Sequence, residues 1–289
     1  MAYHRVCMSY DLKLRFDPAI AERDFLQYFA SRRHFASRGS DIAYQNPDTG
    51  VGFAIRYQSS KAFLARTRIS GAHFEMNYFR PRFFGVEAEM ELSAMVARFA
   101  PSIEDPQMHG MGQGPYAGEG FLRGWNFGNE LAVRAILNGN PNPQVKTMPA
   151  GKLQAAWTWN YKKPQRLAEA NDQQFVPGIM PIAVRDTPSL VAVWALGMPV
   201  LLPSVDYVLV GRDDSGVKRY GLAPWSEVLA VVQSAGIDIG SDPLDIRYAV
   251  TPAPIARWVA EISEVDPKTL PRLSFDEIID SEIAQSALR

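Results

Sequence analysis

The chain has 289 residues, of which 47% are apolar and 21% are charged, and its formal net charge is −1. This composition is typical of a globular protein and excludes a chain that is disordered throughout. The length suits two domains of ordinary size or one large domain. The near-zero net charge argues against nucleic acid as a partner, because proteins that bind nucleic acid usually concentrate positive charge on one face.

The cysteine content and the hydropathy pattern suggest a location. Cys7 is the only cysteine, so no internal disulfide can form, which favours a reducing compartment. Charged residues interrupt the segment that follows Cys7, so we expect no secretory signal. The most apolar run, residues 190–203, is too short to cross a bilayer. We therefore expect a cytoplasmic protein that does not enter the membrane.

The first elements alternate between strand and helix patterns. Apolar residues at every second position predict a strand over residues 6–16. Asp17-Pro18 then predicts a helix start, with Asp as the N-cap and Pro at the first helical position, and this helix runs to about residue 31. Residues 40–58 read as a hairpin whose turn is NPDTG, because Pro interrupts a strand ladder and Gly tolerates positive φ.

Two further strands are predicted at 62–69 and 72–79, joined by Ser70-Gly71. The second of them alternates apolar residues with His73, Glu75 and Asn77. A helix follows over 83–100 and ends before a proline. This order predicts an α+β fold, with a mostly antiparallel sheet and helices packed on one of its faces.

Two loops divide the chain. The glycine-rich segment 101–120 reads as a loop and precedes a predicted helix over 121–138. A second loop rich in Asn and Pro follows. We therefore predict two α+β domains of similar size, 1–138 and 152–289, joined by a linker over 139–151.

The second half has the same α+β character. Its opening segment, 152–163, fits both a strand and a helix, and the pattern does not separate the two. A hairpin turn is predicted at Asp213–Gly216, and a helix begins at Pro224 and ends at Gly236. The other predicted strands are 179–185, 190–202, 205–211 and 244–250, and the other helices are 253–263 and 274–286.

Common catalytic patterns are missing from the sequence. The glycine-rich loop lacks the Gly-Lys-Ser/Thr of a phosphate-binding loop, and no Gly-x-Ser-x-Gly is present. The histidines are His4, His34, His73 and His109, and no two have the spacing of metal ligands on one element. We predict no cofactor and no metal site, while a site assembled from distant segments stays open.

Paired carboxylates are one candidate for a functional site. Glu87 and Glu91 are four residues apart on the predicted helix 83–100 and share a face. Such a pair can act as acid and base or bind a hard metal ion, or it can belong to a solvated helix face. Arg80 and Arg82 lie just upstream and could neutralise the two acids.

Arginines on the predicted strands are a second candidate. Arg56, Arg66 and Arg68 recur there, and Arg66 and Arg68 share one face of their strand. An arginine row on a sheet can bind an acidic partner protein, a nucleotide or RNA, or can simply face solvent. The near-neutral charge of the chain argues against RNA.

Several phrases of the sequence resemble a known class of proteins. They include NPDTGVGFAIRY, YFRPRFFGVEAEMEL and ALGMPVLLPSVDYVLVGRD. These phrases resemble bacterial immunity proteins of polymorphic-toxin and type VI effector systems. The resemblance implies a cytoplasmic α+β protein that has no active site and whose partner is a cognate toxin. It assigns no functional residue.

Two functions are therefore carried forward. The first is a non-enzymatic protein that binds another protein, in its sharpest form an immunity protein that neutralises a toxin. The alternative is an enzyme or a small-molecule-binding protein with a cleft between the two halves. In that case the glycine-rich loop 110–120 would gate the cleft, and Glu87, Glu91 and Arg80 or Arg82 would supply its polar groups.

Overall fold

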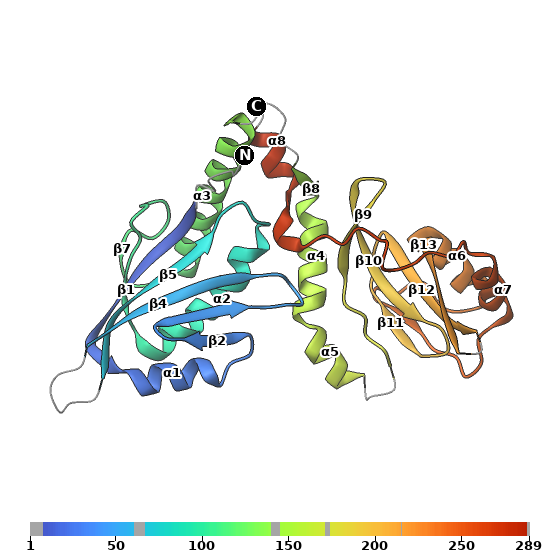
Figure 1. Ribbon diagram of the computed structural model, residues 1–289, viewed down its shortest axis with the longest axis horizontal. Coiled ribbons are helices and arrows are strands. Elements are labelled where there is room, and N and C mark those ends of the chain that lie inside the picture. The colour runs from blue at the N-terminus through green and yellow to red at the C-terminus, as the bar shows by residue number, and fades with distance from the viewer. Residues whose placement is uncertain (1–7, 61–66, 140–144, 171–173, 215, 288–289) are drawn as a thin grey trace. The chain divides into compact units, whose positions relative to one another are not determined.

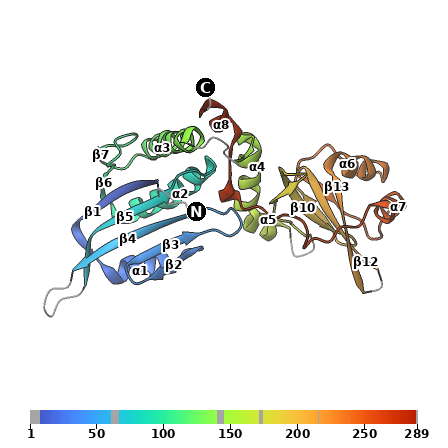
Figure 2. The same ribbon diagram turned by 45° about the horizontal axis from the view of Figure 1, so that its top comes forward.

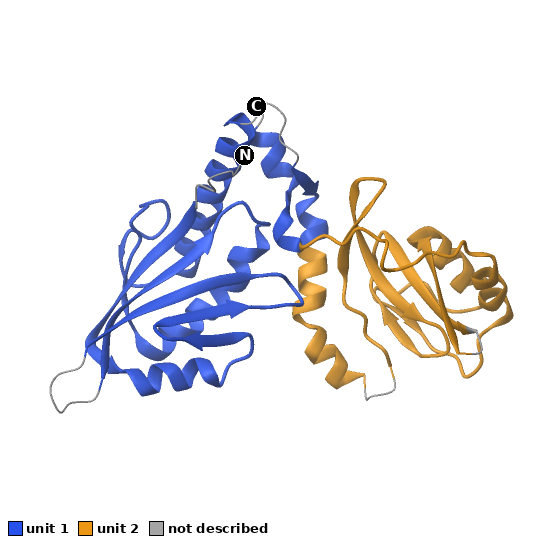
Figure 3. Cartoon of the chain, in the orientation of Figure 1, with its two compact units in different colours: residues 1–153, 275–289 blue, residues 154–274 orange. Residues whose placement is uncertain are grey.

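The chain folds as an α+β protein (Figure 1). A computed structural model describes residues 8–60, 67–139, 145–170, 174–214 and 216–287. The chain divides into two compact units (Figure 3). Unit 1 comprises Met1–Leu153 and Phe275–Arg289, and unit 2 comprises Gln154–Ser274.

Unit 1 is built on a sheet in which the described strands follow the order β2-β3-β4-β5-β1-β6-β7. Every neighbouring pair in this sheet is antiparallel, as the sequence predicts. The strands are β1 (Ser9–Ala21), β2 (Phe35–Arg38), β3 (Asp41–Gln45), β4 (Gly52–Ser60), β5 (Arg68–Asn77), β6 (Ser102–Glu104) and β7 (Gln113–Gly114).

Three helices pack on one face of this sheet. They are α1 (Glu22–Ala30), α2 (Phe83–Phe99) and α3 (Gly118–Gly139), all labelled in Figure 2. Their aromatic residues meet the side chains that the strands bury: Phe25 of α1 and Phe99 of α2 both contact Phe16 of β1, and Phe121 of α3 contacts Phe74 of β5. The predicted one-sided packing is confirmed, and the opposite face of the sheet carries the alternate, polar residues.

Glycines let α3 lie close to the sheet. A Cβ atom added at Gly124 would lie 2.3 Å from the Tyr10 hydroxyl oxygen, and one added at Gly128 would lie 2.0 Å from the Tyr78 hydroxyl oxygen. Only a residue without a side chain fits at either position, because real Cβ atoms do not approach other atoms so closely. The glycines of segment 101–120 are thus followed by further glycines within α3, which allow this helix to pack closely on the sheet.

The end of the chain returns to unit 1. Strand β15 (Ile278–Asp280) pairs in parallel with β8 (Lys146–Met148), and α8 (Ser281–Ala287) packs its apolar residues against α3. The predicted helix 274–286 is therefore wrong in its first half, where a 3₁₀ turn (Phe275–Glu277) and β15 replace it. The division at Leu153 and Ser274 also differs from the predicted boundary over 139–151.

Unit 2 contains a smaller sheet with the order β13-β12-β10-β9 in its described part, and a separate strand pair, β11 with β14. Strands β10 and β12 are parallel, and the other neighbours are antiparallel. The fully buried Trp194 of β10 lies beside Trp258 of α7 (Ala253–Glu261), with ring centroids 6.3 Å apart. The strands are β9 (Met180–Val184), β10 (Thr187–Ala195), β11 (Val200–Leu202), β12 (Tyr207–Asp214), β13 (Val217–Pro224) and β14 (Leu244–Ile246).

The helices of this part of the chain largely follow the sequence pattern. The undecided segment 152–163 is helical, in α4 (Ala150–Tyr161), which begins in unit 1. The other helices are α5 (Lys163–Glu169), α6 (Trp225–Ser234) and α7 (Ala253–Glu261).

Two local predictions in unit 1 are wrong because strand pairing overrides them. The helix expected at Asp17-Pro18 starts only at Glu22, since β1 continues and Ile20 pairs with Ile69 of β5. Ser70-Gly71 is not a turn between two strands but lies within β5, where the register with β4 shifts and leaves a bulge. Residues 61–66 of the predicted strand 62–69 lie outside the described residues.

The close approach of α3 to the sheet predicts a stability cost for added volume. Gly124→Ala and Gly128→Ala should each lower the free energy of unfolding by about 1–3 kcal/mol, because overpacking forces the tyrosine rings and the helix apart. Gly151→Ala is the matched control, since nothing lies within 4 Å of its added Cβ. Urea denaturation measures all three variants, and a Gly128→Ala protein as stable as Gly151→Ala would contradict this account of the packing.

Candidate functional site

The face of the unit 1 sheet that the helices leave open carries a cross-strand row of charged and polar side chains. Paired positions in β3, β4, β5, β1 and β6 contribute, in this order, Asp41, Arg56, His73, Lys13 and Glu104. The antiparallel register brings these residues together, although they are far apart in the sequence. We call this surface the open face.

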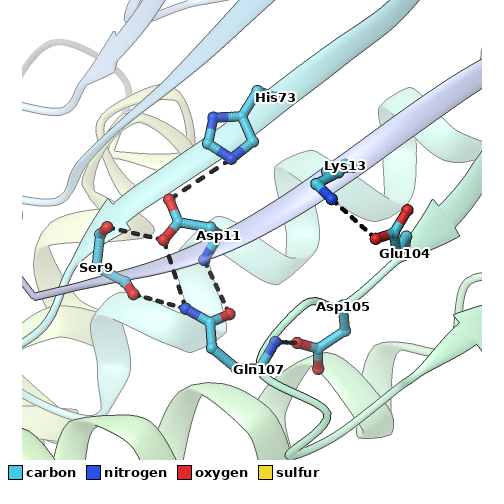
Figure 4. A network of polar contacts seen from close by, with 7 residues as sticks. All are labelled: Ser9, Asp11, Lys13, His73, Glu104, Asp105 and Gln107. Atoms are coloured by element: carbon cyan, nitrogen blue, oxygen red, sulfur yellow. Dashed lines mark hydrogen bonds and ion pairs between the residues drawn. The ribbon is translucent and has the colours of Figure 1, made fainter.

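A hydrogen-bond network fixes Asp11 on the open face (Figure 4). Its Oδ2 atom accepts hydrogen bonds from Ser9 Oγ at 2.9 Å and from Gln107 Nε2 at 3.4 Å. The Gln107 amide also binds the backbone, because its Oε1 accepts from the Asp11 N–H at 3.3 Å and its Nε2 donates to the Ser9 carbonyl at 2.9 Å. The second carboxylate oxygen of Asp11, Oδ1, lies 3.7 Å from His73 Nε2, which is too long for a direct hydrogen bond.

Asp105 supports this network from inside the unit. The residue is fully buried, and one of its oxygens accepts from the Gln107 N–H at 3.0 Å. The other accepts from the Tyr10 hydroxyl at 3.2 Å and from the N–H groups of Gly110 and Met111 at 3.3 Å. Burial, and next the charge of Asp105, raise the pKa of Tyr10, so the phenol keeps its proton and remains a donor.

The same carboxylate anchors the start of the glycine-rich loop. Gly110 also packs closely on α3, since a Cβ added there would lie 2.0 Å from the Gly120 carbonyl oxygen. These contacts fix residues 110 and 111 within unit 1. Gly110 therefore has a packing role, in addition to the gating role that the sequence suggests for the loop.

A shallow depression opens beside His73 on the open face. Its volume is about 480 Å³, and its polar lining comes from Lys13, Arg15, Gln58, Ser70, Gly71 and His73. Lys13 Nζ lies 2.9 Å and Arg15 Nη2 lies 3.7 Å from the carboxylate of Glu104. The hydrogen bond from Lys13 lowers the pKa of Glu104, so this acid stays ionised between the two cations.

The predicted pair Glu87 and Glu91 does not form an open site. Glu87 is fully buried, and its Oε1 accepts from Tyr44 Oη at 2.7 Å, Asn46 Nδ2 at 2.8 Å and Thr49 Oγ1 at 3.1 Å. The prediction of a solvated helix face is therefore wrong for Glu87, which ties the NPDTG turn to α2. Glu91 forms an ion pair with Arg32, with an N–O distance of 2.5 Å.

Arg80 and Arg82 contact the C-terminal segment that returns to unit 1. Arg82 donates its backbone N–H to Asp280 Oδ2 at 2.8 Å, and its guanidinium pairs with Glu130 at 2.9 Å. Arg80 Nη2 lies 3.9 Å from Asp276. These contacts join the start of α2 to the end of the chain.

The strand arginines occupy different places. Arg56 lies on the open face and pairs with Asp41 at 2.8 Å. Arg68 is exposed near the end of the same sheet and donates to the Ala19 carbonyl at 2.6 Å. Arg66 lies outside the described residues. Among the predicted binding residues that the structure describes, Arg56 alone belongs to the row around His73.

Sequence reasoning did not select Asp11, Lys13, Arg15 and Gln107 for the site. The available signal was the alternation of β1 and β5, which places polar residues at every second position. That pattern shows which residues share a face but leaves open which strands are neighbours and in what register.

Comparisons with known proteins add no identification. No protein-family model, curated protein or solved structure that we compared matches the chain. Among the helices of the described residues, none has both the length and the apolar character that a membrane span requires.

The Glu87 contacts predict a large stability loss on truncation. Glu87→Ala should lower the free energy of unfolding by about 3 kcal/mol or more, because each buried donor left without an acceptor costs about 1–3 kcal/mol. Glu91→Ala is the control on the same helix and should cost about 1 kcal/mol, since Glu91 forms a single, partly exposed ion pair. Equal losses in chemical denaturation would contradict the structural role of Glu87.

Asp280 predicts a pH dependence of stability. Burial raises the pKa of its carboxyl group, and the N–H and charge of Arg82 only partly offset this. A raised pKa in the folded state means that the contribution of Asp280 to stability is present at low pH and is lost as the pH rises through that pKa. Asp280→Asn cannot ionise, so it should gain stability relative to wild type between pH 3 and pH 7. Urea unfolding across this range measures the difference, and a relative gain by wild type would contradict it.

Proposed function

We propose that this chain is a non-enzymatic protein that binds an acidic partner protein through the open face of unit 1. The observation that carries the proposal is the depression between Lys13, Arg15 and His73, on a sheet face that the helices of unit 1 leave uncovered. In an antiparallel sheet with one covered face, the other face is available for contact.

The charges around the depression favour an acidic group. The side chains of Lys13 and Arg15 are 51% and 74% exposed, and both approach one carboxylate, that of Glu104. Two cations that share one acid leave a local excess of positive charge. Exposed ion pairs of this kind contribute little to stability, so a carboxylate from a partner can replace Glu104 at small cost. Arginine in particular binds carboxylates with two parallel hydrogen bonds.

The resemblance to immunity proteins suggests which partner to test first. A cognate toxin with an acidic surface would fit the open face, and binding would neutralise it. The enzymatic alternative receives less support from its two proposed carboxylates. Glu87 is buried, and Glu91 forms an ion pair with Arg32.

Charge reversal tests the proposal. The tagged wild-type chain is used to capture partners from a lysate of its source cells, and purified partners are then measured against Arg15→Glu. We expect a stoichiometric partner whose affinity falls by about 10-fold or more in the variant and weakens with added salt. Lys218→Glu, an exposed lysine in unit 2, is the matched control and should bind as wild type does.

Two outcomes would overturn the proposal. One is a capture that yields no stoichiometric protein. The other is a partner that binds Arg15→Glu and wild type with the same affinity, provided that thermal unfolding shows both chains to be folded.

A further inference from the structure

A cluster of metal-binding groups lies beside the basic depression on the open face. Asp11 of β1 and His73 and Glu75 of β5 are each half-buried. Each offers one ligand atom, and these atoms all lie within 4.8 Å of one another. The proposed protein-binding role takes no account of this cluster.

The strand register places two negative charges opposite each other. Asp11 pairs directly with Glu75 across the strands, and like charges in that relation destabilise a sheet. Among the described residues, neither acid forms an ion pair with a lysine or arginine. The neighbouring cations Lys13 and Arg56 pair with Glu104 and Asp41, and Arg56 acts on Glu75 only through a weaker charge interaction. A bound cation would remove the repulsion between Asp11 and Glu75.

The distance between Asp11 and His73 fits shared coordination. Their facing atoms, Oδ1 and Nε2, lie 3.7 Å apart. Two bonds of about 2.0–2.2 Å at a tetrahedral angle place ligand atoms about 3.4 Å apart. A small adjustment of the two side chains would therefore bring both atoms onto one ion.

The surroundings of Asp11 resemble the outer shell of a metal site. Ser9 and Gln107 both donate to Oδ2, which leaves Oδ1 directed toward His73 (Figure 4). Gln107 is itself held by the buried Asp105. Hydrogen bonds that fix a ligating carboxylate in this way raise metal affinity, because they lower the cost of ordering the ligand.

We propose that Asp11, His73 and Glu75 bind a divalent transition-metal ion, with Zn²⁺ as the first candidate. One imidazole nitrogen and two carboxylate oxygens suit Zn²⁺, whereas Ca²⁺ takes oxygen ligands only. Three protein ligands leave a coordination position open, and His73 also lines the adjoining depression. Water or a carboxylate from another molecule can occupy that position. The proposal does not depend on the protein-binding function.

Zinc titration of the full chain tests the site. The protein is prepared without a histidine tag, stripped with chelator and titrated with ZnCl₂ by calorimetry. We expect saturable binding of one equivalent, which Asp11→Asn and His73→Gln each weaken by about 10-fold or more. His109→Gln is the matched control, because it changes a histidine of the same unit that contacts Phe127 instead of the cluster. A CaCl₂ titration should show no comparable binding.

A positioning variant gives a sharper test. Gln107→Ala keeps all three ligands but removes a donor to Asp11, and it should weaken zinc binding by about 10-fold. Thermal unfolding without metal confirms that each variant is folded. If a variant is not folded, wild type alone supplies the test: the imidazole proton signals of His73 must shift in an NMR spectrum when one equivalent of zinc is added.

Absence of zinc binding by wild type would overturn the proposal. So would full binding by the double variant Asp11→Asn/His73→Gln, which would place the ion at other residues. Unshifted His73 signals at saturating zinc would also overturn the proposal.

Discussion

The buried carboxylate of Asp105 links three parts of unit 1. Through Tyr10 it contacts β1 beneath α3, through Gly110 and Met111 it holds the glycine-rich loop, and through Gln107 it reaches the open face. A buried acid needs several donors, because an unsolvated charge is costly in a medium of low polarity. The groups that donate hydrogen bonds to Asp105 therefore fix the course of the glycine-rich loop and, through Gln107, the orientation of Asp11.

Glu87 of α2 follows the same rule elsewhere on the covered face of the sheet. Its donors include Tyr44, Asn46 and Thr49, so Oε1 of Glu87 holds the hairpin turn NPDTG against α2. In these contacts both buried acids accept hydrogen bonds from neutral donors. The acids of the interior thus organise the scaffold, while the acids and bases of the open face remain accessible for binding.

The sequence predicted those elements whose pattern is local. The alternation of β1, the hairpin over 40–58 and the helix 83–100 follow from side-chain periodicity and turn residues, and the structure confirms them. Asp17-Pro18 failed as a helix start because pairing with β5 extends β1, and the final helix failed because Ile278 and Ile279 pair with β8.

The candidate site depended on information that the sequence does not carry. The spacing of Glu87 and Glu91 correctly placed them on one helix, but what each one faces is decided by packing. Asp11 and His73 come together only through the register of β1 and β5. The site therefore depends on that register, since a shift of β1 by one residue would turn Asp11 to the covered face.

Alternate positions along β1 give the open face two chemical characters side by side. Asp11 faces Glu75, Lys13 faces His73, and Arg15 faces Gly71, so an acidic end grades into a basic one along the same strand pair. A divalent ion at the acidic end would cancel the two negative charges of Asp11 and Glu75. An acidic partner would then meet the basic end, with Lys13 and Arg15, without repulsion from the neighbouring acids. Binding of the ion and of the partner would strengthen each other by equal factors, because coupling between two sites on one molecule is reciprocal.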